Sequence, residues 1–442
     1  MSKIFVLPFL VLLFSVALCP IFCKSFWEKY STKMILSLAL LVAFSYIFIY
    51  KDYVTPIMST VEYIDFILFI VALYIISGGI YIDINTTSTP LKNTFFLFLG
   101  AVCSNFIGTT GAATLLIRPF MKINKHRLKP YHIVFFIFIV CNVGGCLSVI
   151  GDPPIFIAFL KGMPFSWPIK NNFLPWLVTV GALLVMFFFI DRRDSIVNGQ
   201  EAVGKDDDGD KPLIVIDGKR NFFWLFLATC AVFINPIIIP SIPTISFHGH
   251  EISFLREVLL VLICFVAFLS SPKYILKKND FSWEPIKEVI VLFFGIFITM
   301  APALSIIEGA LENINADFIN ATSLFWFTAF FSSFLDNTPT LLNAMAISMS
   351  LQGLDLNNVT DVYNYAIGNF TDSINHNHLR AICVTSVFFG GFTYIGNGPN
   401  FMVKSIAEKN DVVMPSFGGF IVNYSLKYLF PVLVFVWYCF CR

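Results

Sequence analysis

Four short polar segments, rich in glycine, proline, asparagine and threonine, interrupt otherwise apolar stretches of this sequence. Two of them carry an acidic residue, Asp152 in the first half of the chain and Asp336 in the second. A carboxylate held at membrane depth costs a few kcal/mol or more, so such a residue usually serves a function. Alternatively, either carboxylate could accept hydrogen bonds from a helix end and serve only to stabilise the interruption of the helix. We expect both carboxylates to bind Na⁺, with H⁺ as the competing ion.

Hydroxyl and amide side chains surround both acids. Such oxygens, together with carbonyls freed by a broken helix, form the kind of site that a hard cation such as sodium prefers. Helix N-termini at the same place favour an anion instead. Single Ser or Thr residues could merely bond back to the preceding helical turn, and Asn142 could bond a neighbouring helix. The predicted ion- or substrate-binding residues beside the acids are Ser104, Asn105, Thr109, Thr110, Asn142, Asn337, Thr338, Asn397 and Asn400.

The composition places these segments in a membrane. Of the 442 residues, 57% are hydrophobic and only 13% are charged, a balance that soluble domains do not sustain over such a length. The net charge of +1 gives no indication of a nucleic-acid partner. No phosphate-binding G-x-x-x-x-G-K-[ST] motif and no nucleophile–base pair stands out, so we expect neither ATP as the energy source nor an enzyme. The ten cysteines contain no C-x-x-C pair, and we expect no bound cofactor.

The apolar stretches predict ten membrane spans and two re-entrant hairpins. The hairpins are expected at 94–121 and 323–350, where two apolar arms flank a polar centre. Each arm is too short to cross a hydrocarbon core of ~30 Å alone, although one tilted span at each place is the alternative. Two of the spans contain the glycine-rich breaks. The spans are expected at about 4–23, 33–50, 62–82, 132–161, 173–190, 222–240, 254–271, 286–305, 380–403 and 417–441.

The order of spans, hairpin and broken span is the same in the two halves of the chain. We therefore predict an all-α polytopic membrane protein with a first repeat over 1–190 and a second over 222–442. A hydrophilic linker over 191–221 joins them. Residues 1–23 could be a cleaved signal peptide or a retained first span, and we expect the span.

The charges of the loops predict how the repeats are oriented. The loops 122–131 and 272–287 carry clustered lysines and are expected on the cytoplasmic side, whereas 306–322 and 351–379 lack Lys and Arg and are expected outside. This layout opens the two hairpins to opposite sides, so the repeats are expected to be inverted.

The two breaks resemble those of the ion transporter superfamily, which includes NhaD-type sodium/proton antiporters, arsenite pumps and citrate or dicarboxylate carriers. The stretches Val140–Gly162 and Tyr394–Lys404 are most similar to a bacterial subgroup whose members are called citrate transporters or sodium/proton antiporters. The resemblance implies hairpin tips and broken spans that meet near the bilayer centre. It also implies a homodimer, in a bacterial inner membrane, in which a transport domain slides against a fixed scaffold.

The hairpin tips depart from one part of that pattern. In carboxylate carriers of the superfamily both tips read Ser-Asn-Thr, whereas here they read Gly108-Thr109-Thr110 and Asp336-Asn337-Thr338. Sodium/proton antiport by elevator-type alternating access is therefore the leading hypothesis, in which one acidic site binds Na⁺ when ionised and releases it when protonated. Cation-coupled transport of citrate or another carboxylate is the alternative. A channel or scaffold is less favoured, because a continuous pore needs no pair of broken spans.

Overall fold

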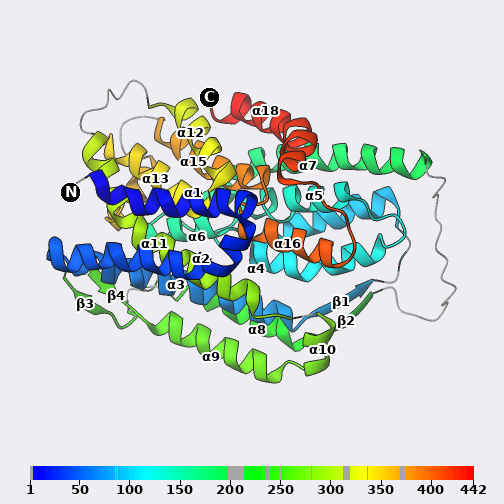
Figure 1. The fold of residues 1–442 in the computed structure, drawn as a ribbon, viewed down its shortest axis with the longest axis horizontal. Helices are drawn as coiled ribbons and strands as arrows, with labels where there is room; N and C mark the ends of the chain where they lie inside the picture. Colours follow the sequence, from blue (N-terminus) through cyan, green and yellow to red (C-terminus); the bar gives the residue numbers. More distant parts are fainter. Residues whose placement is uncertain are drawn as a thin grey trace.

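The computed structural model shows an all-α polytopic membrane protein, most of whose helices run along one common direction (Figure 1). Within the part of the chain that the structure describes, six helical stretches are long and apolar enough to cross a membrane. They are Lys29–Ile49, Val54–Gly78, Pro90–Ile123, Pro130–Leu147, Trp167–Val197 and Phe417–Phe440. The structure describes residues 3–84, 86, 88–197, 214–231, 233–234, 236, 239, 241–248, 250–279, 281–311, 319–335, 337–368 and 374–442.

One group of helices packs around the third helix, α3. In it α11 lies against α2 and α3, while α8 and α9 cover another side of α3. The helix α9 exposes a row of large apolar side chains, among them Val258, Leu262, Phe265 and Leu269, as expected of a helix that faces lipid. The members of this group are α1 (Leu7–Phe22), α2 (Lys24–Phe44), α3 (Val54–Gly78), α8 (Arg220–Ala231), α9 (Leu255–Ser270) and α11 (Glu284–Leu311).

The second group contains both hairpins and both broken spans, and its members pack closely on one another. The members that come from the first half of the chain are α4 (Pro90–Ile123), α5 (Pro130–Ile139), η3 (Val143–Leu147), α6 (Pro153–Lys161) and α7 (Trp167–Val197). Those that come from the second half are α12 (Ala321–Phe334), α13 (Asn337–Ser350), α14 (Val359–Ile367), α15 (Ile374–Phe388), η5 (Phe389–Phe392), α16 (Gly398–Lys409), α17 (Phe417–Phe420), η6 (Ile421–Leu429) and α18 (Phe430–Phe440).

The helix α4 is a hairpin that folds back on itself at Gly108. This residue has φ 74° and ψ 156°, a backbone conformation that residues with a Cβ rarely adopt. The two ends of α4 consequently meet, since Asn93 Nδ2 donates to Asn124 Oδ1 at 2.8 Å. In a straight helix of this length the same ends would lie roughly 50 Å apart. The chain therefore turns back inside the segment 94–121, where the sequence analysis expects a hairpin, and does not run through it as one straight helix.

The second hairpin consists of α12 and α13, which pack against each other. Its first arm ends at Phe334, and Leu335 follows in an extended conformation. The second arm begins at Asn337. Asp336, which the sequence analysis singled out, lies outside the described residues.

Both broken spans contain a stretch outside the α-helix that ends on an extended residue, and a proline stands in the first turn of the helix that follows. In the first, α5 and α6 are separated by η3, and Asp152 stands before α6 with φ −141° and ψ 141°. In the second, α15 and α16 are separated by η5, and Asn397 stands before α16 with φ −149° and ψ 139°. The chain folds tightly at both breaks. A Cβ on Gly151 would lie 2.1 Å from the Gly145 carbonyl oxygen, so only glycine fits there.

Several elements differ from the expected layout. The third span ends at Gly78 rather than near residue 82, because Tyr81–Ile84 forms strand β1, which pairs antiparallel with β2 (Ile214–Asp217). The expected linker 191–221 therefore contains β2, and also the last turns of α7, which runs to Val197. The short helix α14 lies within the expected outer loop 351–379. Further short elements are η1 (Lys3–Val6), η2 (Ser45–Ile49), α10 (Lys273–Lys278), β3 (Ile245–Phe247) and β4 (His250–Ile252).

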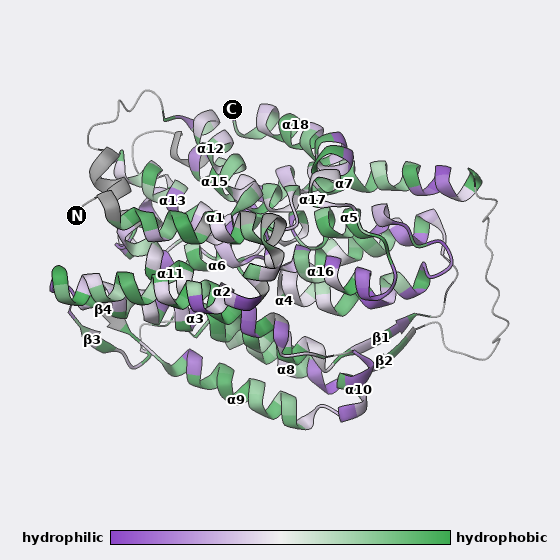
Figure 2. Ribbon diagram, viewed as in Figure 1, coloured by the Kyte–Doolittle hydropathy of each residue, from purple (hydrophilic) through white to green (hydrophobic). Residues whose placement is uncertain are grey.

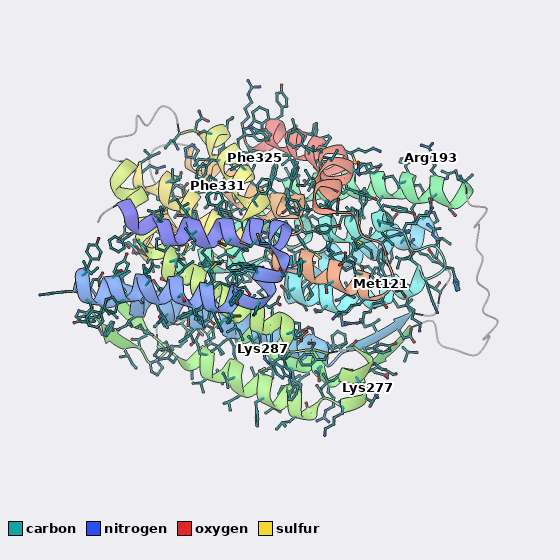
Figure 3. The ribbon with its side chains drawn as sticks, in the orientation of Figure 1. Met121, Arg193, Lys277, Lys287, Phe325 and Phe331 are labelled. Atoms are coloured by element: carbon teal, nitrogen blue, oxygen red, sulfur yellow. The ribbon has the colours of Figure 1, made fainter. Side chains whose placement is uncertain are left out.

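Hydrophilic residues gather at one end of the molecule. Figure 2 shows them around β1, β2, α10 and the far end of α7, on the right of the view. In Figure 3, Arg193 and Lys277 lie at this same end. This is the end that carries the two basic loops, so it corresponds to the expected cytoplasmic side.

Candidate functional site

The Asp152 carboxylate is the point at which both hairpins and both breaks meet. Thr109 Oγ1, at the tip of the first hairpin, donates to Asp152 Oδ1 at 2.8 Å. Asn337 Nδ2, at the start of the second arm of the other hairpin, donates to Asp152 Oδ2 at 3.1 Å. Asn397 Nδ2, at the second break, lies 3.5 Å from Asp152 Oδ1. All four side chains are buried, and Asp152 is 0% exposed.

A chain of asparagines joins the two breaks beside this carboxylate. Asn397 Nδ2 donates to Asn142 Oδ1 at 3.2 Å and to the Cys141 carbonyl at 3.0 Å. Asn142 Nδ2 in turn donates to Asn400 Oδ1 at 2.7 Å. Asn400 Nδ2 donates to the Gly390 and Thr393 carbonyls, which belong to the non-helical part of the second break. Asn142 thus bonds two side chains of the second break, and its contact with an ion or substrate stays a prediction.

The contacts between hairpin and break recur in the two halves of the chain. Ser104 Oγ donates to the Val140 carbonyl at 2.7 Å, and Ser332 Oγ donates to the Ser386 carbonyl at 2.5 Å. Each donor lies five residues before the tip residue of its own hairpin, Thr109 or Asn337. The matching contacts show that each hairpin is fastened to its break in the same way.

A second matched pair of contacts uses hydroxyls on the breaks. Ser148 Oγ donates to the Asn105 carbonyl at 2.5 Å, and Thr393 Oγ1 donates to the Ser333 carbonyl at 2.6 Å. Asn105 is further held through its side chain, which donates to the Gly144 carbonyl at 2.6 Å. The structure thus gives Ser104 and Asn105 bonds to backbone, which fix the first hairpin, rather than contacts with Asp152.

The remaining predicted residues lie close to the same point. Thr110 lines a narrow cavity with Thr109 and Pro153. The opposite wall of this cavity comes from α3, through Phe69 and Leu73. The cavity therefore lies between the two groups of helices. Thr338 is buried directly after Asn337.

Four helix N-termini surround the carboxylate. Two belong to α6 and α16, which begin directly after Asp152 and Asn397. The other two are the second arms of the hairpins, which begin at Thr109 and Asn337. Each N-terminus carries a partial positive charge, which favours an anion nearby. Prolines occupy the first turns of α6, α13 and α16, and the Thr109 N–H donates to the Gly151 carbonyl, so the attraction comes from the helix dipoles. The four segments 104–111, 142–154, 332–340 and 390–400 contain no Lys or Arg, so these partial charges are their main positive contribution.

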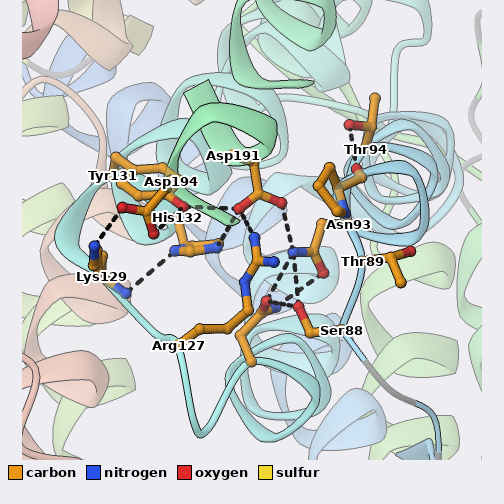
Figure 4. A network of polar contacts seen from close by, with 12 residues as sticks. Ser88, Thr89, Asn93, Thr94, Arg127, Lys129, Tyr131, His132, Asp191 and Asp194 are labelled. Atoms are coloured by element: carbon orange, nitrogen blue, oxygen red, sulfur yellow. Dashed lines mark hydrogen bonds and ion pairs between the residues drawn. The ribbon is translucent and has the colours of Figure 1, made fainter. Parts of the chain in front are cut away.

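A buried cluster at the other end of the first hairpin holds that hairpin in place (Figure 4). Its centre is Asp191 on α7, which is 0% exposed and forms an ion pair with Arg127. Tyr131 Oη donates to Asp191 Oδ1 at 2.7 Å, and Asn93 Nδ2 donates to Asp191 Oδ2 at 2.9 Å. His132 Nε2 lies 3.2 Å from Asp191 Oδ1. The cluster ties α4, α5 and α7 together, and the sequence analysis did not identify it.

Interrupted helices that meet from two halves of a chain around a buried carboxylate are the architecture of a secondary transporter. The fold and the site thus define a multi-pass membrane transport protein. A family model described as "Putative citrate transport" matches residues 1–441, and the chain belongs to this ion transporter family. No curated protein matches the chain.

Proposed function

We propose that this protein is a secondary active transporter of citrate or a related carboxylate, driven by a cation that binds at Asp152. The observation that carries the proposal is the convergence of Thr109, Asn337 and Asn397 on one buried carboxylate among four helix N-termini. Such a site combines the two features that co-transport requires. A fixed negative charge binds the cation, and the partial positive charges of the helix N-termini attract the anion.

The charges explain why the substrate would need a cation. A carboxylate substrate that approached the ionised Asp152 would be repelled, by an amount that grows as water is excluded from the site. No basic side chain in the four segments of the site offsets this repulsion. Binding of Na⁺ or H⁺ at Asp152 removes the repulsion and leaves the helix N-termini free to attract the substrate. The cation and the carboxylate are therefore expected to bind together.

The amide side chains around Asp152 are suited to the site both without a cation and with bound Na⁺. As placed here, the Nδ2 groups of Asn337 and Asn397 face the carboxylate, which stabilises its charge without a bound metal ion. Rotation of either amide by half a turn presents its oxygen instead, and amide oxygens together with a carboxylate are ligands for Na⁺. Asp336, next to Asn337, would be the second acid of the predicted cation site.

Sodium/proton antiport is the second candidate function. It is favoured by the same buried carboxylate, because a site that Na⁺ and H⁺ occupy in turn exchanges the two ions without a further substrate. In either case we propose elevator-type movement of the hairpins and broken spans against the group around α3. A homodimer in a bacterial inner membrane is part of this proposal and rests on the resemblance of the breaks.

Transport by the purified protein in liposomes separates the two candidates. Labelled citrate uptake is measured with an inward Na⁺ gradient, with an inward H⁺ gradient and with neither, and a pH dye records proton movement when Na⁺ is added without citrate. The proposal predicts citrate uptake that depends on one of the gradients and is lost in Asp152→Asn. Proton movement without citrate, together with no citrate uptake, would favour antiport and refute carboxylate transport.

A matched control separates the role of the Asp152 charge from a general effect of replacing an acid. Asp411 is exposed and has φ 61°, a conformation that asparagine adopts about as readily as aspartate. Asp411→Asn should therefore transport like the parent protein. If Asp152→Asn keeps the full cation dependence of the parent protein, Asp152 does not bind the coupling ion.

A further inference from the structure

Three charged side chains meet inside the group of helices around α3, and the proposed transport site does not use them. Arg256 Nη2, on α9, lies 3.1 Å from Asp65 Oδ2 on α3 and 2.6 Å from Glu257 Oε1. Arg256 Nε donates to the same Glu257 oxygen at 2.6 Å. Arg256 and Glu257 are each 4% exposed. One guanidinium thus serves two carboxyl groups in the interior of the protein.

The second oxygens of both carboxyl groups have no hydrogen-bond partner in the described part of the chain. These buried atoms are Asp65 Oδ1 and Glu257 Oε2. The two carboxyl groups are neighbours, because one oxygen of each lies against the same guanidinium nitrogen, Arg256 Nη2. Two ionised carboxylates in this position repel, whereas a single proton between them converts the repulsion into a hydrogen bond. With that proton the two acids and the guanidinium are neutral overall, and without it they carry one negative charge.

This cluster touches the helix that carries Asp152. The Arg256 guanidinium carbon lies 6.0 Å from the centre of the Phe156 ring on α6. The Phe156 ring stacks on Phe69 of α3 at 4.7 Å. Phe156 lies one helical turn after Asp152, so α6 connects the cluster to the transport site.

An ion pair follows on the same face of the two helices. Lys161 Nζ of α6 lies 2.7 Å from Glu62 Oε1 of α3. Glu62, Asp65 and Phe69 are spaced at three and four residues, so one face of α3 presents all three toward α6. A change in the charge on this face of α3 therefore changes how strongly α3 and α6 pack against each other.

We propose that the Asp65–Glu257 pair is a proton-binding site that couples proton movement to transport, separate from the site at Asp152. The proposal rests on the transport function proposed above and adds a coupled proton to the cation that binds at Asp152. The Asp65 side chain is 20% exposed, which gives the proton access to the pair from one side. Loss of the proton leaves an uncompensated charge against α6. A buried charge without a counter-charge is unfavourable, so deprotonation favours movement of α6 away from α3 and entry of water.

The other charged groups nearby do not replace this pair. Glu62 and Lys161 neutralise each other. The charged side chains of α11 that the structure describes lie at its beginning, on the expected cytoplasmic side. Arg256 and Glu257 lie at the beginning of α9, on the expected outer side. The described charged side chains of α3, α6, α8 and α11 beyond Asp65 are Glu62, Lys161, Arg220, Glu284, Lys287 and Glu288.

Infrared difference spectroscopy of the purified protein tests the site without requiring transport. The carbonyl stretch of a protonated buried carboxyl group should disappear from the parent protein as the pH is raised. This band should be missing in Asp65→Asn and in Glu257→Gln, two near-isosteric changes made separately in case one of them impairs folding. It should remain in Glu62→Gln, which changes the acid one turn away. If the band persists unchanged in both Asp65→Asn and Glu257→Gln, the pair does not hold the proton.

Transport then shows whether the proton on this pair is coupled to carboxylate movement, in addition to the cation at Asp152. In liposomes, Asp65→Asn should lose citrate accumulation driven by a pH gradient while it retains exchange of internal for external citrate. Accumulation by Asp65→Asn that follows the pH dependence of the parent protein would overturn the coupling role. If the parent protein moves no carboxylate although its infrared band is lost in both variants, the proton site stands and the proposed transport function fails.

Discussion

Replacing Gly108 by alanine tests whether α4 is a hairpin. Gly108 has φ 74° and ψ 156°, and an added Cβ would lie 3.3 Å from Leu73 Cδ1 and 3.4 Å from the Ile150 carbonyl oxygen. A residue with a Cβ held in such a conformation costs about 1–3 kcal/mol. Every 1.4 kcal/mol is a factor of ten, so the tip should adopt its observed conformation roughly 5- to 150-fold less often. Because Thr109 follows directly, its bond to Asp152 should weaken as well.

Gly111 provides the matched control in the same helix. It has helical geometry, and its added Cβ would meet only ordinary contacts, the nearest of them 3.6 Å from Ile107 Cβ. Gly111→Ala should therefore be neutral or stabilising by up to about 1 kcal/mol. Thermal unfolding in detergent and citrate uptake in liposomes should both be impaired for Gly108→Ala and not for Gly111→Ala. If Gly108→Ala is as stable and as active as Gly111→Ala, residue 108 is helical and α4 is a straight span.

Two further predictions concern charges away from the transport site. Asp191→Asn should destabilise the protein by about 3–5 kcal/mol, because it leaves the buried Arg127 guanidinium without its counter-charge. The destabilisation should appear as a loss of monodisperse protein in size-exclusion chromatography. Outside the spans, burial raises the pKa of Asp52, but hydrogen bonds from the Thr55 side chain and from the Thr55 and Val54 backbone outweigh it, so the pKa lies below its usual value of 3.8. The ionised Asp52 should accordingly stabilise the folded protein fully above about pH 5, and this stabilisation should disappear as the pH falls through the folded-state pKa. The free energy of unfolding of Asp52→Asn should therefore be lower than that of the parent protein at neutral pH and equal to it in strong acid.

The hairpin and the breaks could be predicted because the residues that form them act locally. Glycine at 108 and the Gly-Asp-Pro-Pro run at 151–154 each stop a helix through the conformation of their own backbone. The apolar arms on either side indicate membrane depth by composition alone. The convergence of Thr109, Asn337 and Asn397 on Asp152 also agrees with the prediction that these residues share one site.

The features that the sequence analysis missed depend on partners far away in the chain. Asp191 and Arg127 are 64 residues apart, and nothing near either residue indicates that the other neutralises it inside the protein. The strand β1 forms because it pairs with β2, which lies far along the chain, after α7. Likewise, the residue types of Ser104 and Asn105 indicate that they can donate hydrogen bonds. Their acceptors could not be predicted, because these are backbone carbonyls of the first break, some forty residues later in the chain. One feature of the sequence could have indicated the cluster around Asp191, since Asp191 is the first charged residue after the apolar run of α7.

The central claim is that a cation at Asp152 permits a carboxylate to bind beside it. Isothermal titration calorimetry of the purified protein with citrate, at increasing Na⁺ and at several pH values, measures this coupling at equilibrium. The account predicts that citrate affinity rises with Na⁺ or H⁺ in the parent protein and no longer depends on that cation in Asp152→Asn. Citrate affinity that is independent of both cations in the parent protein, or equally cation-dependent in Asp152→Asn, would contradict it.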